Sequence, residues 1–330
     1  MQLQSSVAPV NALLRLYDDG DFASPVEALS DVLSRLKADG DMDSFSWRNE
    51  PCVISSFVHA IDGRSSGYGF AVQLPEEKGI AVLLSWTADA HFGSCGNFML
   101  SLIDSLNIDY GSCFEAGPVT RYAYPDTGRA EPFTLSIDGT EVASVLREVD
   151  KEASSYLIER EYDVLLLYRN SSLWQEAWQR YYRMIFRDSF RRLERCAFDI
   201  YTALAPGCLD ETDLAQKLLS WTQGFAYERE KTSSDFASLP SILLGGGSDC
   251  DSRSLLLAVL LKQMNMDAML FVSNVYSHAV AGLVSDHPGF GFTAGDKTYL
   301  IGETTAQGAT WGMISQGQDK QENWIPVLFP

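Results

Sequence analysis

The last quarter of the chain places a cysteine, a histidine and a carboxylate in that order, and this arrangement restricts the fold more than any other feature. The run Gly-Gly-Gly-Ser-Asp-Cys-Asp at 245–251 leads into an apolar stretch, Cys250 to Met264, that is predicted to be a helix. His278 and Glu303 follow in segments of alternating polarity that are predicted to be strands. The sequence therefore predicts a mixed α and β region with the three groups on separate elements.

The start of this helix sets the chemistry of its cysteine. Ser248 or Asp249 is a good N-cap, and the leucines that follow predict a buried helix. The positive end of the helix dipole favours a thiolate at Cys250. Asp249 and Asp251 oppose this effect with their negative charge. We therefore expect that the thiolate needs a histidinium partner at neutral pH.

Cysteine, histidine and carboxylate together are what thiol-based acyl transfer requires. A nucleophilic sulfur needs a base beside it, and the base needs an acid that fixes its orientation. Cys250 is the candidate nucleophile, His278 the candidate base and Glu303 the candidate orienting acid. Each residue taken alone has an ordinary alternative: an inert buried thiol, a structural histidine or a solvated glutamate.

These residues carry a resemblance to a known superfamily. The motifs Gly247-Ser248-Asp249-Cys250-Asp251, His278-Ala279-Val280 and Glu303-Thr304-Thr305 resemble those of the transglutaminase-like superfamily. Its members share a papain-like fold, with the cysteine on a helix and the histidine and acid on adjacent strands. The sequence departs from the family pattern at Ser248, where a glycine is common, and at Glu303, where aspartate is commoner. The resemblance covers residues 207–330.

The resemblance implies an activity and roles for the matched residues. Cys250 would be the nucleophile, His278 the general base and acid, and Glu303 the orienting carboxylate. Gln223 lies in a stretch that resembles the segment upstream of the family's cysteine, and it is a candidate oxyanion donor. Bacterial members with extra domains imply hydrolysis of a peptide or protein substrate by a protease or amidase. A cross-linking transglutaminase and a non-catalytic binding or scaffold protein are the alternatives.

Composition excludes several other functions. The formal net charge of −19 argues against nucleic acid as a partner, because phosphate binding requires basic surface. No stretch reaches the ~18 uninterrupted apolar residues of a membrane span. The first residues lack a positive region followed by an apolar run, so no signal peptide is expected. A cytoplasmic protein and an exported protein whose signal was removed both fit.

Cofactors and metals are not expected. The six cysteines contain no Cys-x-x-Cys pair and are too sparse for a disulfide framework. His91 and Cys95 stand four residues apart and would share a helical face, but a metal site needs further ligands. A small buried thiol is the preferred interpretation of Cys95.

The rest of the chain predicts an α+β protein of several parts. Residues 8–38 are predicted to be two short helices, and residues 45–140 an antiparallel sheet with a covering helix at 97–106. This region is faintly similar to photosystem-P-like and Mog1-like α/β/α sandwiches. A long amphipathic helix is predicted from Leu173 to Leu204. One face of it is rich in arginine, which indicates ion pairing with acids such as Glu152, Glu159 and Glu161 or simple solvation, or alternatively a cleft wall for an anion.

The predicted organisation has three parts. Residues 1–160 form an N-terminal α+β domain of unknown role, which is a candidate module for binding a protein partner. Residues 161–206 form a helical connector, and residues 207–330 form the transglutaminase-like domain. In the last part, strands are predicted at 268–276, 278–284 and 297–303, with a short one at 324–329.

Overall fold

The computed structural model describes residues 1–61, 63–228 and 234–330. The chain divides into two compact units. The first unit comprises Met1–Pro125 and Arg160–Trp174, and the second comprises Asp126–Glu159 and Gln175–Pro330. Helix α4 (Asp150–Leu167) passes from the second unit into the first. The predicted three-part division of the chain stays a prediction.

The first unit contains a six-stranded antiparallel sheet. The strand order is β1-β2-β6-β5-β4-β3. The strands are β1 (Gln2–Gln4), β2 (Asn11–Tyr17), β3 (Asp39–Trp47), β4 (Glu50–His59), β5 (Ser65–Gln73) and β6 (Ile80–Ala88). The predicted strand, turn, strand pattern around residues 67–86 is confirmed as β5 and β6, which pair in register from Ser65 with Ala88 to Gln73 with Ile80.

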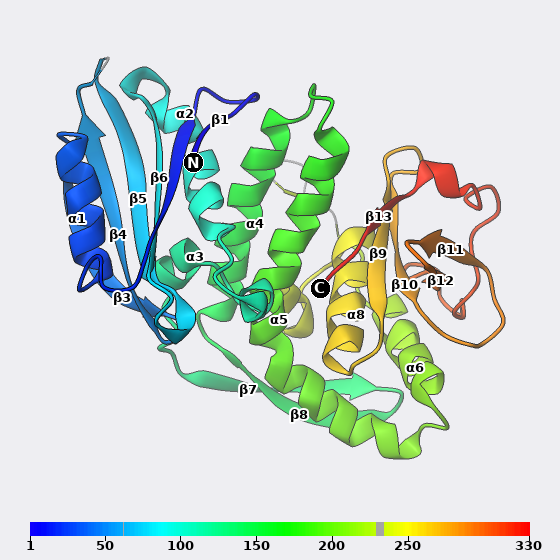
Figure 1. Ribbon diagram of the computed structural model, residues 1–330. Helices are drawn as coiled ribbons and strands as arrows, with labels where there is room; N and C mark the ends of the chain where they lie inside the picture. Colours follow the sequence, from blue (N-terminus) through cyan, green and yellow to red (C-terminus); the bar gives the residue numbers. More distant parts are fainter. Residues whose placement is uncertain (62, 229–233) are drawn as a thin grey trace. The chain divides into compact units, whose positions relative to one another are not determined.

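Helices cover both faces of this sheet. Helix α1 (Pro25–Arg35) packs Leu29 and Val32 against one face, while α2 (Asp89–Asp104) and α3 (Pro118–Ala123) cover the other (Figure 1). Short 3₁₀ turns lie at Pro75–Glu77 and Tyr110–Phe114. The predicted covering helix at 97–106 is confirmed as the second part of α2.

One predicted helix in this unit is wrong. The segment around Leu13 and Leu14 is strand β2, which pairs along its whole length with β6, from Asn11 opposite Trp86 to Tyr17 opposite Ile80. The run of apolar residues is too short for its periodicity to decide between helix and strand, and pairing with a long neighbouring strand decides it. The second predicted helix of this region is confirmed as α1, with Ser24 as its N-cap and Pro25 in its first turn.

The second unit combines a hairpin, helices and a curled five-stranded sheet that forms a half-barrel. The hairpin is β7 (Ala130–Ile137) with β8 (Thr140–Arg147). The helices that follow are α5 (Trp174–Leu204), α6 (Glu211–Gln223), α7 (Leu239–Leu243) and α8 (Cys250–Gln263), with 3₁₀ turns at Ala205–Gly207 and Gln321–Asn323. The strands β9 (Ala268–Ser273), β10 (His278–Leu283), β11 (Gly291–Ala294), β12 (Lys297–Gly302) and β13 (Ile325–Val327) are ordered β11-β12-β10-β9-β13.

Helix α8 is the buried centre of this unit. Its residues from Ser254 to Leu261 have no exposed surface, and it packs on β9 and β10 (Figure 1). A helix that is apolar all round must be covered on every side. This confirms the prediction of a buried helix after Cys250, and with the two sheets it confirms the α+β class. Strand β11 has no counterpart among the predicted strands.

The arginine-rich face of α5 forms ion pairs, and three of its arginines pair with acids that the sequence did not single out. Arg192 lies 2.8 Å from Asp150 and 2.9 Å from Asp188, and is itself nearly buried. Arg191 pairs with Glu194 and Arg195 with Asp199 along the helix. The partners three or four residues away could be predicted from the sequence, because residues at those spacings lie on the same face of a helix. Asp150 was not, because only the packing of α4 on α5 brings it close.

Candidate active site

Cys250 is the first residue of α8, and its surroundings hold it in place. Asp249 is the N-cap: its side chain accepts a hydrogen bond from the Ser252 amide at 2.9 Å, and the Ser252 hydroxyl oxygen accepts one from the Asp249 amide at 3.0 Å. This confirms one of the two predicted caps, with Ser248 outside the helix. Cys250 is only 3% exposed. The nucleophile candidate is therefore fixed at the positive end of a buried helix.

His278 and Glu303 meet because of the register of two neighbouring strands. Ala281 of β10 lies opposite Gly302 of β12. Extending that antiparallel register by one residue puts Glu303 opposite Val280, so His278 is its diagonal neighbour on the same face. The His278 Nε2 atom lies 2.6 Å from the Glu303 Oε2 atom. The structure thus brings together the predicted base and the predicted acid.

A further residue orients the acid. The Glu303 Oε1 atom accepts hydrogen bonds from the Thr305 amide at 2.8 Å and from its hydroxyl at 2.6 Å. Burial disfavours the charged carboxylate, but the hydrogen bond and charge of His278 and the hydrogen bonds of Thr305 outweigh it and lower the pKa of Glu303 below its ordinary value. Glu303 is therefore ionised at neutral pH, with both of its oxygens in use.

The sulfur of Cys250 lies against the strand that carries His278. The backbone N–H of Ala279 acts on this sulfur and favours its charged form. One turn further along α8, the Ser254 hydroxyl lies 3.3 Å from the Ala279 carbonyl oxygen and 3.0 Å from the Thr304 hydroxyl. The N-terminal turn of α8 is thus tied to the residues that directly follow His278 and Glu303.

The thiol of Cys250 is protonated in this state. Its Sγ donates to the Asp251 Oδ1 atom at 3.1 Å. Burial, followed by the charge and hydrogen bond of Asp251 and the charge of Asp249, raises the pKa of this thiol well above its ordinary value. The predicted opposition of the two aspartates to a thiolate is therefore present in the structure.

Gln223 is buried beside the acid and engages its amide with the backbone. Its Nε2 donates to the carbonyl oxygens of Glu303 and Ala309, each at 2.9 Å, and its Oε1 accepts from the Gly308 amide at 3.0 Å. Gln223 therefore holds the segment that follows β12. Both amide hydrogens are occupied there, and the role towards an oxyanion stays a prediction.

Arg253 is a site residue that sequence reasoning missed. It is 2% exposed, and its guanidinium group donates to the Ser248 hydroxyl at 2.9 Å, the Phe225 carbonyl at 2.7 Å and the Thr304 carbonyl at 3.4 Å. These three acceptors stand on the segments that follow Gln223, precede Cys250 and follow Glu303. A lone arginine among leucines is the signal that points to it, because a buried cation must be paired or hydrogen-bonded.

An aromatic residue also packs beside the histidine. The ring of Trp324 lies edge-on to the His278 ring, with centroids 6.2 Å apart, and its indole N–H donates to the Gln318 carbonyl at 2.8 Å. Trp324 is 5% exposed. It limits the positions that the imidazole ring can take. Its sequence position next to a short strand gives no sign of this contact.

The other candidate groups lie elsewhere. His91 and Cys95 are both on α2, and within residues 1–61, 63–228 and 234–330 no group of three or more His, Cys, Asp or Glu side chains is arranged to hold a metal ion. None of the helices that the structure describes is long and apolar enough to cross a bilayer.

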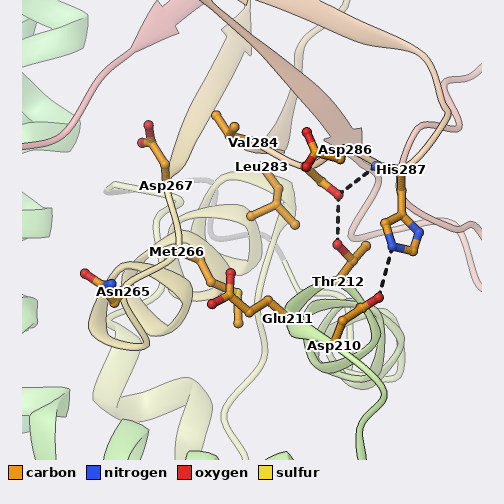
Figure 2. A pocket seen from close by; sticks show the side chains of 11 residues that line it. Asp210, Glu211, Thr212, Asn265, Met266, Asp267, Leu283, Val284, Asp286 and His287 are labelled. Atoms are coloured by element: carbon orange, nitrogen blue, oxygen red, sulfur yellow. Dashed lines mark hydrogen bonds and ion pairs between the residues drawn. The ribbon is translucent and has the colours of Figure 1, made fainter.

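A polar pocket of about 470 Å³ lies at the far end of α8 and β10 from the candidate triad (Figure 2). Its walls come from the start of α6, the turn after α8 and the segment after β10. Two hydrogen bonds join those walls: Thr212 to Ser285 at 2.8 Å, and the His287 Nε2 atom to Asp210 at 3.2 Å. Leu283, which ends β10, lines this pocket, whereas His278 begins the same strand. The pocket is therefore separate from the candidate active site.

Comparisons with known proteins add no family. No protein-family model matches this chain, and no curated protein matches it either. Among solved structures, the chain is similar to PA94, a protein of unknown function from Pseudomonas aeruginosa, with a TM-score of 0.26 and 9% identity. That match covers 32% of this chain and 79% of the other. At this level of similarity, no property of that protein transfers to this chain.

Proposed function

We propose that this chain is a cysteine-dependent acyl-transfer enzyme of the transglutaminase-like type, with Cys250, His278 and Glu303 as its triad. The observation that carries the proposal is the 2.6 Å contact between His278 Nε2 and Glu303 Oε2. Cys250 starts a buried helix, and its sulfur interacts with the backbone N–H of Ala279, the residue after His278. The most favoured reaction is hydrolysis of a peptide or amide by way of a thioester, as in a protease or amidase. The proposed fold of residues 207–330 is the papain-like fold of that superfamily.

The contact with Glu303 determines which nitrogen acts as the base. An ionised carboxylate only accepts hydrogen bonds, so His278 donates its Nε2 hydrogen to Glu303. The neutral imidazole then carries its lone pair on Nδ1. Nδ1 takes the proton from the Cys250 sulfur, and Glu303 stabilises the imidazolium that forms.

The remaining steps follow from this ion pair. The Cys250 thiolate attacks the carbonyl carbon of an amide, and the His278 imidazolium gives its proton to the departing amine as the C–N bond breaks. Water then loses a proton to His278, attacks the thioester and releases the acid and the thiol. The amide N–H groups in the first turn of a helix have no acceptor within the helix, so that of Cys250 is a candidate donor to the oxyanion.

A second candidate function is a binding or scaffold protein that retains the fold without catalysis. The specific observation in its favour is the state of the thiol, because Cys250 is buried and its pKa is raised. A thiol in this condition reacts slowly unless a base takes its proton. The two candidates therefore differ in whether His278 activates Cys250.

The test measures alkylation of Cys250 by iodoacetamide between pH 5 and pH 9, with the adduct located by mass spectrometry. We expect labelling of Cys250 below pH 8 in the wild type, and its loss in His278→Ala. Glu303→Gln keeps the shape of the side chain but removes its charge, so turnover of a peptide substrate should fall on the order of 10²- to 10⁴-fold. Equal labelling of wild type and His278→Ala would contradict the enzyme proposal.

Whether water or an amine accepts the acyl group from Cys250 is tested with peptide amides in the presence and absence of a primary amine. Hydrolysis releases the acid whether or not the amine is present, whereas a cross-linking enzyme incorporates the amine into the product. Cys250→Ala is the control and should abolish both products. Amine incorporation as the main product would favour the transglutaminase alternative over the amidase.

A further inference from the structure

The hydrogen of the Cys250 thiol has two competing acceptors. The proposed reaction requires that it pass to Nδ1 of His278, yet in this structure the sulfur donates to the Asp251 Oδ1 atom at 3.1 Å. An S–H group aims at one acceptor at a time, and a carboxylate only accepts hydrogen bonds. The observed arrangement therefore keeps the proton on the sulfur.

Asp251 is held in this position by a second element. The hydroxyl group of Tyr182, on α5, donates to the other carboxylate oxygen of Asp251. Tyr182 has no exposed surface, and its ring packs against Tyr181 with centroids 5.3 Å apart and against Phe236 at 6.2 Å. The Tyr181 hydroxyl is bonded in turn to Ser234 at 2.9 Å. The carboxylate is therefore oriented by a packed aromatic cluster, and a free rotation of Asp251 away from the thiol is blocked.

The acidic side chains around the sulfur also favour the protonated thiol. Asp249 and Asp251 at the start of α8 both disfavour its thiolate. The charge of Asp235 raises the pKa of Asp249 and of Tyr181. The two buried tyrosines of α5, Tyr181 and Tyr182, remain neutral, because burial raises the pKa of each well above its ordinary value. Arg253 is the cation that opposes these acids, because its charge attracts that of a Cys250 thiolate, and its guanidinium also donates to Ser248, Phe225 and Thr304. His278, paired with Glu303, is the base to which the thiol hydrogen must pass.

We propose that Asp251, oriented by Tyr182, is a positioning residue that holds the Cys250 thiol protonated at rest, and that activation transfers the S–H hydrogen bond from Asp251 to His278. This inference rests on the proposed function. In the activating step one hydrogen bond, from sulfur to Asp251, breaks and another, from sulfur to Nδ1 of His278, forms. The proton then moves from sulfur to Nδ1, which leaves a thiolate and an imidazolium, and no other atom is gained or lost.

The experiment compares Asp251→Asn with Asp249→Asn in the full chain. Both variants remove one negative charge from the start of α8, but only the first changes the group that accepts the thiol hydrogen, where a neutral amide, a weaker acceptor, takes the place of the carboxylate. The rate of Cys250 alkylation by iodoacetamide is measured from pH 5 to pH 10. We expect the midpoint of the curve of alkylation rate against pH to lie about one pH unit or more lower in Asp251→Asn than in the wild type. Labelling of Cys250 at pH 7 is then about tenfold faster in the variant. The shift in Asp249→Asn should be smaller.

Tyr182→Phe provides a second variant that keeps the charge of Asp251 and removes only its anchor. Its midpoint is expected between those of the wild type and Asp251→Asn, and thermal unfolding confirms that each variant is folded. The inference is overturned if the midpoint of Asp251→Asn equals that of the wild type, or moves no further than that of Asp249→Asn.

The same measurements separate this inference from the proposed function. If His278→Ala abolishes labelling but Asp251→Asn leaves the midpoint unchanged, the triad stands and the resting-state role of Asp251 is wrong. If His278→Ala labels like the wild type, the proposed function itself fails. A midpoint that falls in Asp251→Asn and a loss of labelling in His278→Ala support both.

Discussion

Asp249 is a helix cap that is buried next to another acid, and these two conditions make its charge costly. Burial, and then the charge of Asp251, raise its pKa from 3.8 to about 6, although hydrogen bonds from Ser252 favour the charged form. The folded state therefore retains a proton on Asp249 at a pH where the unfolded chain has lost it. Through linkage, the stability contributed by this group falls as the pH rises from about 4 through about 6.

Replacing Asp249 by Asn should therefore help more at high pH than at low pH. An asparagine side chain still accepts from the Ser252 amide, so the cap is kept and the buried charge is removed. We expect the gain in unfolding free energy of Asp249→Asn over the wild type to be about 2 kcal/mol larger at pH 7.5 than at pH 4.5. Urea unfolding at the two pH values measures it. An equal difference at both would contradict the raised pKa.

The site residues that could be identified from the sequence are those that stand in recognisable local sequence patterns. Cys250 follows a glycine-rich turn, and His278 and Glu303 stand in strand-like runs, so all three were candidates before the structure was known. Tyr182 could not be identified, because 69 residues separate it from Asp251 and only the packing of α5 beside α8 brings the two together. The thiol's own acceptor was visible as a neighbouring charge, but not as a hydrogen bond.

Arg253 connects helix α8 to three other segments of the chain, so its replacement should reduce the stability of the fold. The three acceptors of Arg253 lie on separate segments, and its loss leaves the buried Thr304 carbonyl and Ser248 hydroxyl and the part-buried Phe225 carbonyl without this donor. A buried polar group left unsatisfied costs about 1–3 kcal/mol. Arg253 therefore contributes to the alignment of the segments on both sides of the helix.

Arg253→Met should reduce the free energy of unfolding by about 3–5 kcal/mol, since two or three such groups lose their partner. Chemical denaturation measures this loss. Lys262→Met is the matched control, because it makes the same kind of change at the partly exposed end of the same helix. Its effect should stay below about 1 kcal/mol. Equal effects of the two substitutions would show that Arg253 does not organise these loops.

At the scale of elements, periodicity predicted what was long and strongly patterned. The helices α5, α6 and α8 and the strands β9, β10 and β12 all appear where the sequence indicated them. Short segments could not be predicted in this way. Strand β11 spans only Gly291–Ala294, and it exists because it pairs with β12. Strand β2 likewise owes its conformation to β6, a partner more than 60 residues away in the chain, which no local window contains.

The elements that belong to the second unit determine where the chain can be cut into fragments that fold. Helix α5 belongs to this unit, and its side chains hold the last residues of the chain: Phe186 stacks on Phe329 with centroids 4.3 Å apart, and Gln179 donates to the Pro326 carbonyl at 2.8 Å. Arg183 donates to the Leu328 carbonyl at 3.0 Å. These contacts anchor the segment around β13, which pairs with β9 at one edge of the sheet.

A fragment that begins at residue 207 should therefore fail to fold, whereas a fragment of residues 126–330 should fold. The shorter fragment contains the candidate triad but lacks α5, so Phe329, Asp251 and the buried face of α8 lose the cover that α5 gives them. The longer fragment retains every residue of the second unit. Thermal unfolding followed by circular dichroism distinguishes the two: we expect a cooperative transition only for residues 126–330. A cooperative transition of residues 207–330 at the same temperature would show that α5 is a connector and not part of this fold. In that case the boundary at residue 207 would be the correct one.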